Sequence, residues 1–120
     1  MRPVIDTKAL DNIRSLSPDS PTEFLHEAIT VFLDDLAKQL PNLCDTARSG
    51  DASATQRIAH SLKSTSASLG ALNLSLLFKR METMSQTNVL ENAGDLLEKI
   101  EEEYREVEKA LICELRRSAS

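Results

Sequence analysis

The sequence predicts an all-α domain. Among 120 residues there are only three glycines and four prolines, and aromatic residues make up 3% of the chain. β-Sandwiches and barrels need frequent turns and strands rich in β-branched or aromatic residues, so this composition argues against them. The length suits one domain with one hydrophobic core. We therefore expect a single domain over residues 1–120, with its core over about residues 20–115.

A short helix is predicted first. Asp6 can cap it, and Leu10, Ile13 and Leu16 recur at helical spacing after this cap. The sequence Ser17-Pro18-Asp19 then interrupts the pattern. We interpret this segment as an accessory lid element.

A long helix follows. The segment from Ser20 to Glu23 combines capping-box spacing with a proline at the first helical position. Apolar residues recur at helical spacing from Leu25 to Ala47, and Pro41 predicts a bend. Gly50 suits a left-handed C-cap and Asp51 the N-cap of the next helix.

Three more helices are predicted beyond Asp51. One spans about Thr55–Leu69, and a second carries apolar residues from Leu72 to Met84, up to a polar loop at 85–88. The last has apolar residues at alternating three- and four-residue steps from Leu97 to Leu115. Four main helices with short links predict an antiparallel up-down four-helix bundle, with the short extra helix at its N-terminus.

The third predicted helix presents a histidine to solvent. Ile58, Leu62, Thr65 and Leu69 form one stripe at about 100° per residue, and His60 lies about 160–180° from it. The helical neighbours of His60 are short or cationic, and none is a carboxylate; they include Gln56, Arg57, Lys63, Ser64 and Ala67. This arrangement predicts an accessible nucleophile beside positive charge and no metal site.

The segment around this histidine resembles the signature of histidine-containing phosphotransfer (HPt) domains, HxLKGSSxxLGA. It reads His60-Ser-Leu-Lys63-Ser-Thr-Ser-Ala-Ser-Leu-Gly70-Ala71 in this chain. The segment before Gly50 and the pair Met81-Glu82 also look like the family, so the resemblance covers roughly residues 20–115. The chain departs from the motif at Ser64, where the family usually has glycine.

The resemblance implies a phosphocarrier. His60 would accept a phosphoryl group from a receiver-domain aspartate and pass it to another receiver, and Lys63 would stabilise that group. Gly70 would permit tight packing of the helix corner. Together with Arg57, Gln56 and Ala67, Ser64 and Gly70 are the predicted partner-docking residues. Because Ser64 lies about 40° around the helix from His60, its side chain narrows the path by which a partner reaches the imidazole, without blocking it.

The chain lacks the parts of an ATP-dependent enzyme. It has no Gly-rich phosphate loop and no GxxxxGK[ST] motif. We therefore expect no cofactor on this chain, with Mg²⁺ held only by the receiver partner. The expected partners are response-regulator receiver domains and a hybrid sensor kinase.

Two other functions are consistent with the composition. The phosphoacceptor part of a sensor histidine kinase also carries a helical histidine, but such kinases dimerise through that helix pair and have an acidic residue where Ser61 stands. A monomer would favour the phosphocarrier. A helical adaptor without chemistry is the second alternative, favoured by the heptad-like last helix, and phosphorylation of His60 would separate it from a phosphocarrier.

Charge and cysteine content exclude other classes. A net charge of -5 argues against nucleic-acid binding, which needs a basic surface. The chain has no secretion-like h-region and no apolar run near 18 residues, so we expect no membrane insertion. Cys44 and Cys113 show no metal spacing and predict reduced thiols in the cytoplasm.

Two further features of the sequence need separate interpretation. Glu23 and His26 have the ExxH spacing of di-iron bundles, but Arg57 stands where a second pair would need a carboxylate. We therefore interpret His26 as a surface residue. Lys79 and Arg80 are interpreted either as a basic rim near His60 or as ordinary exposed charges.

Overall fold

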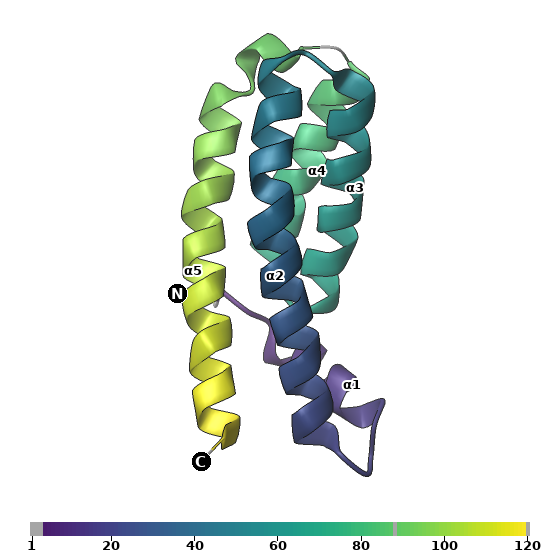
Figure 1. Cartoon of the computed structure of the whole chain (residues 1–120), viewed down its shortest axis with the longest axis vertical. Coiled ribbons are helices and arrows are strands. Elements are labelled where there is room, and N and C mark those ends of the chain that lie inside the picture. The colour runs from purple at the N-terminus through teal and green to yellow at the C-terminus, as the bar shows by residue number, and fades with distance from the viewer. Residues whose placement is uncertain (1–3, 88, 120) are drawn as a thin grey trace.

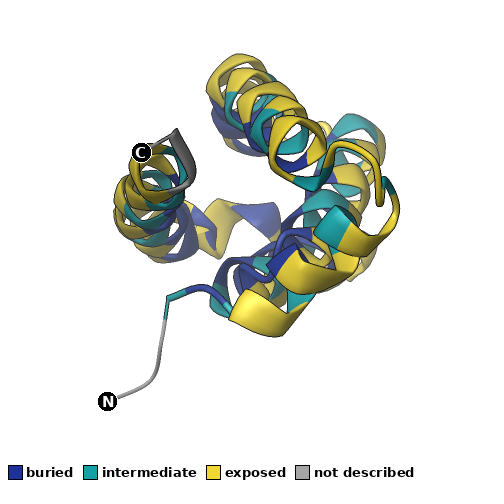
Figure 2. Ribbon diagram, turned by 90° about the horizontal axis from the view of Figure 1, so that it is seen from below, coloured by how far each residue is buried: buried dark blue, intermediate teal, exposed yellow. Residues whose placement is uncertain are grey.

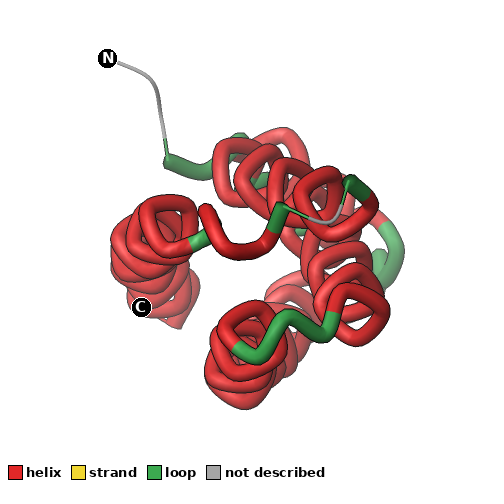
Figure 3. Tube along the Cα trace, turned by 90° about the horizontal axis from the view of Figure 1, so that it is seen from above, coloured by secondary structure: helices red, strands yellow, loops and turns green. Residues whose placement is uncertain are grey.

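The computed structural model describes residues 4–87 and 89–119, and within them it contains helices and no strand (Figure 3). The elements are given in chain order: α1 (Thr7–Ser15), α2 (Pro21–Arg48), α3 (Ala52–Ser68), α4 (Leu72–Gln86), the 3₁₀ helix η1 (Leu90–Asn92) and α5 (Gly94–Ala119). Successive long helices run in opposite directions (Figure 1). The predicted up-down four-helix bundle with an extra N-terminal helix is confirmed. None of the described helices is long and apolar enough to cross a bilayer.

The caps at two helix starts agree with the sequence. Asp6 accepts a hydrogen bond from the backbone N–H of Lys8, and Asp51 accepts one from Ala54. Ser20 makes no side-chain cap, so the expected capping box is wrong, although Pro21 occupies the first turn of α2. A fixed φ and a missing N–H make proline suitable at that position without further support. α2 continues through Pro41 as one helix.

The helices differ in length, and this difference leaves part of α2 free to pack against α1. At 1.5 Å per residue, α2 is about 42 Å long and α3 about 26 Å. The lower ends of α2 and α5 in Figure 1 therefore extend beyond the α3–α4 pair, and α1 lies beside this part of α2. Leu10 of α1 is fully buried there. α1 is thus a packed part of the core.

One hydrophobic core runs the length of the molecule, and it lines the inner faces of the helices (Figure 2). Its largest fully buried side chains are Phe32, Phe78, Leu10, Leu25, Ile29, Leu36, Leu43, Leu62, Leu74, Met81, Ile100 and Leu111. At about 1.5–3 kcal/mol for each large side chain removed from water, this burial stabilises the bundle.

The buried face of α3 differs from the predicted stripe. Thr55, Ala59, Leu62 and Ser66 are buried in α3, whereas Ile58 is only partly buried. α3 packs against both α2 and α4, so its buried face spans two neighbours. The small side chains on that face allow close approach of the α4 backbone. The predicted stripe is correct at Leu62 and Leu69. Elsewhere the buried face of α3 is rotated about the helix axis relative to the predicted stripe.

The boundaries of the last two helices also differ from the expectation. α4 continues through the start of the predicted loop to Gln86, because Ser85 is buried and its hydroxyl donates to the Glu82 carbonyl at 2.7 Å. Asn88, the end of the predicted loop, lies outside the described residues. α5 begins at Gly94, one turn earlier than the periodicity indicated.

Candidate functional site

His60 lies in the middle of α3 with its side chain 62% exposed. It faces away from Leu62, which is fully buried two residues later. The predicted exposure of the imidazole is therefore confirmed.

A carboxylate from the neighbouring helix holds the ring. Oε2 of Glu82, on α4, lies 2.7 Å from Nδ1 of His60. A carboxylate only accepts hydrogen bonds, so Nδ1 of the neutral imidazole carries the proton and donates it. The lone pair of the ring is then on Nε2, the nitrogen not bonded to Glu82. This contact selects the tautomer and restrains the ring.

Lys63 completes a three-residue network. Its Nζ donates to Oε1 of Glu82 at 2.8 Å, so each carboxylate oxygen has one partner. Glu82 is buried, with 9% of the residue exposed. The hydrogen bond from Lys63 lowers the pKa of Glu82 most. Burial opposes this shift, and the hydrogen bond from His60 and the positive charge of Lys63 lower the pKa further. Glu82 is therefore ionised at neutral pH.

The expectation that no carboxylate lies beside His60 is wrong. It considered only neighbours along α3, and Glu82 arrives from another helix, 22 residues later. A signal existed in the sequence, because Phe78, Met81 and Ser85 place Glu82 near the apolar side of its helix. A carboxylate on such a face needs a charged or hydrogen-bonding partner.

The predicted docking residues divide into two groups. Arg57, Ser64 and Ala67 are exposed on α3 and Gln56 is partly exposed, so a partner can reach all four. Gly70 is buried at the α3–α4 corner, where a Cβ would lie 2.5 Å from the carbonyl oxygen of Asp6. Burial leaves Gly70 little surface to offer a partner, so the structure does not support its docking assignment, which stays a prediction. Its positive φ of 79° and this close approach explain why glycine stands there.

An open apolar groove adjoins the histidine helix. Residues of α1, α2 and α3 line it, and its volume is about 640 Å³. Ser64 and Ser68 form its α3 wall, and Val31 and Phe24 of α2 contribute apolar surface. Ser64 also donates to the His60 carbonyl at 3.3 Å, so the groove begins one helical turn from the imidazole.

The remaining candidate residues lie elsewhere. His26 is partly buried, and its Nε2 is buried without a hydrogen-bond partner among the described residues, which corrects its interpretation as a plain surface residue. No group of three His, Cys, Asp or Glu side chains suited to a metal occurs in the described part of the chain. Lys79 and Arg80 line a separate depression between α4 and α5.

Comparisons with known proteins agree with this geometry. The Hpt domain family model matches residues 27–110. The crystal structure of histidine-containing phosphotransfer protein B (HptB) from Pseudomonas aeruginosa PAO1 is similar to 98% of this chain and 98% of its own, with a TM-score of 0.86 and 26% identity. No curated protein sequence matches the chain. Hpt phosphotransfer proteins are phosphocarriers and not kinases, and the chain belongs to this family as a histidine phosphotransfer protein of a phosphorelay.

Proposed function

We propose that His60 is the phosphoryl acceptor and that its Nε2 is the reacting atom. The observation that carries the proposal is the 2.7 Å contact between Nδ1 and Glu82 on an imidazole that is 62% exposed. One nitrogen is occupied by the carboxylate, and the other is free to react. Phosphoryl transfer depends mainly on positioning and charge stabilisation, and this contact supplies both.

The transfer step needs no residue that accepts a proton. Nε2 attacks the phosphorus of an aspartyl phosphate on a receiver domain, an N–P bond forms, and the P–O bond to the aspartate carboxylate breaks. The aspartate leaves as a carboxylate, and the Nδ1 proton stays on the ring. Positive charge that develops on the imidazole is stabilised by ionised Glu82. Reversal of the same step passes the group to a second receiver.

Lys63 has two roles in this proposal. One of its three N–H donors is used by Glu82 at 2.8 Å, which leaves two for the phosphoryl oxygens. Its side chain is 28% exposed, so the ammonium remains accessible at the surface. We expect Lys63 to hold Glu82 in place and to offset the charge of the phosphoryl group.

The partners are proposed from the same chemistry. A receiver domain supplies the reactive aspartate and the Mg²⁺, and this chain supplies no cofactor and no ATP-dependent activity. Exposed small side chains at Ser64 and Ala67 allow close approach of such a partner. We further propose a monomeric carrier, served by a hybrid sensor kinase, in the cytoplasm, where the free thiols of Cys44 and Cys113 stay reduced.

The test compares the two histidines of the chain. A phosphorylated receiver domain is incubated with wild type, His60→Gln and His26→Gln. Acid-labile, base-stable phosphate is expected on wild type and His26→Gln and absent from His60→Gln. Stability of His60→Gln should change by no more than about 0.5 kcal/mol, because the side chain is mostly exposed and glutamine keeps a donor for Glu82. Phosphate on His60→Gln would show that another residue is the acceptor, and a chain that never accepts phosphate would favour the helical adaptor.

A further inference from the structure

Large apolar side chains are exposed to solvent in the groove beside His60. Leu16 is 73% exposed, Val31 62% and Phe24 38%, and all three line this groove. Leu16 directly follows α1, and Val31 and Phe24 belong to α2. They lie together although the sequence separates them. A contiguous patch of this kind is typical of an interaction surface.

The groove is continuous with the proposed phosphoacceptor surface. Ser64 belongs to both, since it lines the groove and contacts the His60 backbone one turn away. A specific protein interface covers about 800 Å² on each partner. A receiver domain that places its aspartate at Nε2 of His60 therefore also covers Ser64 and reaches the groove.

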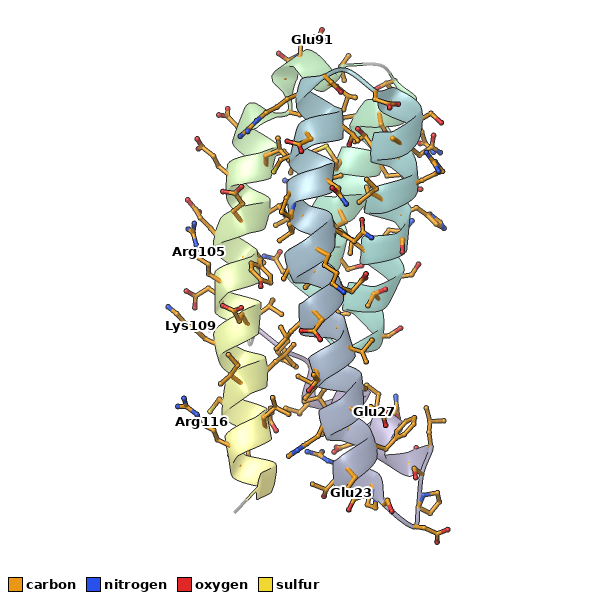
Figure 4. The ribbon with its side chains drawn as sticks, viewed as in Figure 1. Glu23, Glu27, Glu91, Arg105, Lys109 and Arg116 are labelled. Atoms are coloured by element: carbon orange, nitrogen blue, oxygen red, sulfur yellow. The ribbon has the colours of Figure 1, made fainter. Side chains whose placement is uncertain are left out.

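Two carboxylates give the groove a negative rim. Glu27 and Asp35 line it, and neither makes an ion pair with any described residue. No lysine or arginine is among its lining residues. Figure 4 shows Glu27 on the lower part of α2, whereas the labelled cations Arg105, Lys109 and Arg116 project from the other edge of the molecule. The charge of this rim is therefore not neutralised within the described part of the chain.

We infer that Glu27 and Asp35 are specificity residues, which select receiver domains whose docking surface carries lysine or arginine beside an apolar stripe. The apolar stripe would cover Val31 and Leu16, and the cations would meet the two carboxylates. This inference rests on the proposed function of His60. Charges at the edge of an interface act mainly on association rate and on the choice of partner. A receiver with acidic residues at the same positions is repelled.

The experiment reverses the two rim charges. The Glu27→Lys/Asp35→Lys variant is compared with Glu98→Lys/Glu102→Lys, which makes the same change in net charge at exposed positions of α5 outside the groove. Transfer from phosphorylated receivers is measured against receiver concentration at low and high salt. Circular-dichroism melts verify that both variants are folded.

For a receiver with a basic docking surface, the rim variant should raise KM on the order of tenfold at low salt and leave the maximal rate unchanged. Its salt dependence should fall, because screening acts on the same charges. An acidic receiver should gain affinity for the rim variant. The α5 control should behave as wild type with both receivers. Equal behaviour of the rim variant and the α5 control would overturn the inference.

A binding assay separates this inference from the proposed function. Calorimetric titration of each receiver into His60→Gln measures docking without phosphoryl transfer. Salt-dependent preference for the basic receiver, lost in the rim variant built on His60→Gln, would support the inference. Docking that does not depend on the rim charges overturns the inference even if His60 is phosphorylated. Phosphate on another residue overturns only the proposed acceptor.

Discussion

The proposed reactivity of His60 involves one residue, Glu82, that the local sequence does not place beside it. Helical periodicity along α3 was enough to predict the exposed imidazole and the nearby Lys63. It could not place Glu82, because the contact depends on how α4 is rotated and how far it is shifted along α3. Such contacts between helices are set by the packing of both faces, and no single segment contains that information.

Replacing Glu82 tests its role as a positioning residue. Glu82→Gln keeps an oxygen that can accept from Nδ1 but removes the charge that stabilises the ring during transfer. We expect the maximal transfer rate to fall on the order of tenfold or more, as when the outer partner of a histidine is removed. KM for the receiver should stay unchanged, since Glu82 is buried and offers little surface to a docking partner.

Nitrogen NMR of the imidazole provides the second measurement. Wild-type His60 should be predominantly Nδ1-protonated when neutral, whereas Glu82→Ala, which also removes the acceptor, should shift the population toward the Nε2-protonated tautomer. Unchanged tautomer populations together with unchanged rates would assign Glu82 to packing alone.

At the scale of the elements, the sequence of each helix is enough to predict that helix. The contacts where two helices meet depend on more than one segment of the chain. Asp51 caps α3, and Gly50 adopts a φ of 78°, both as predicted. The rotation of α3 was less predictable, because Ala59 and Ser66 are buried for their small size and not for their hydrophobicity. The α3–α4 corner was predicted to be compact, yet its contact with Asp6 could not be inferred from either helix.

Two glycines with the same conformation form a matched pair at these joints. Gly50 and Gly70 have φ of 78° and 79°, but a Cβ meets nothing within 4 Å at Gly50 and lies 2.5 Å from the Asp6 carbonyl at Gly70. Gly50→Ala should cost about 1–2 kcal/mol, the cost of a left-handed residue with a side chain. Gly70→Ala should cost more, because the Asp6 segment must also move, which would distort the 2.8 Å hydrogen bond from the Asp6 N–H to the Gly70 carbonyl.

Denaturant unfolding of both variants measures the difference, and hydrogen exchange locates it. Faster exchange over Thr7–Ser15 is expected in Gly70→Ala and not in Gly50→Ala. Equal losses of stability in the two variants would mean that the corner does not anchor α1.

At the scale of the whole molecule, the sequence predicted the architecture but not its proportions. The molecule measures 47 × 27 × 20 Å, since α2 and α5 are far longer than the α3–α4 pair. α1 covers the apolar surface that this mismatch leaves on α2, and Arg14 of α1 reaches Glu114 of α5 at 3.8 Å. α1 thereby forms one wall of the groove next to α3. Its position follows from the relative lengths of the other helices.

The network at Glu82 also links α3 to α4, so it should contribute to global stability in a pH-dependent way. The pKa of Glu82 in the folded protein lies below its ordinary value of 4.5, chiefly because of the hydrogen bond from Lys63. The unfolded chain therefore takes up the proton first as the pH falls. The stabilisation is fully present above the unfolded pKa and is lost as the pH falls through the folded pKa.

Wild type and Glu82→Gln should accordingly differ most in unfolding free energy at neutral pH, with wild type the more stable. The difference should shrink as the pH falls below about 4.5, because protonated Glu82 resembles glutamine in shape and charge. Urea unfolding of both proteins across pH 3 to 7 measures it, and subtracting the two curves removes the titration of every other carboxylate. A difference that stays constant over this range would mean that ionised Glu82 does not join the two helices, and Lys63 would then be left to act on the phosphoryl group alone.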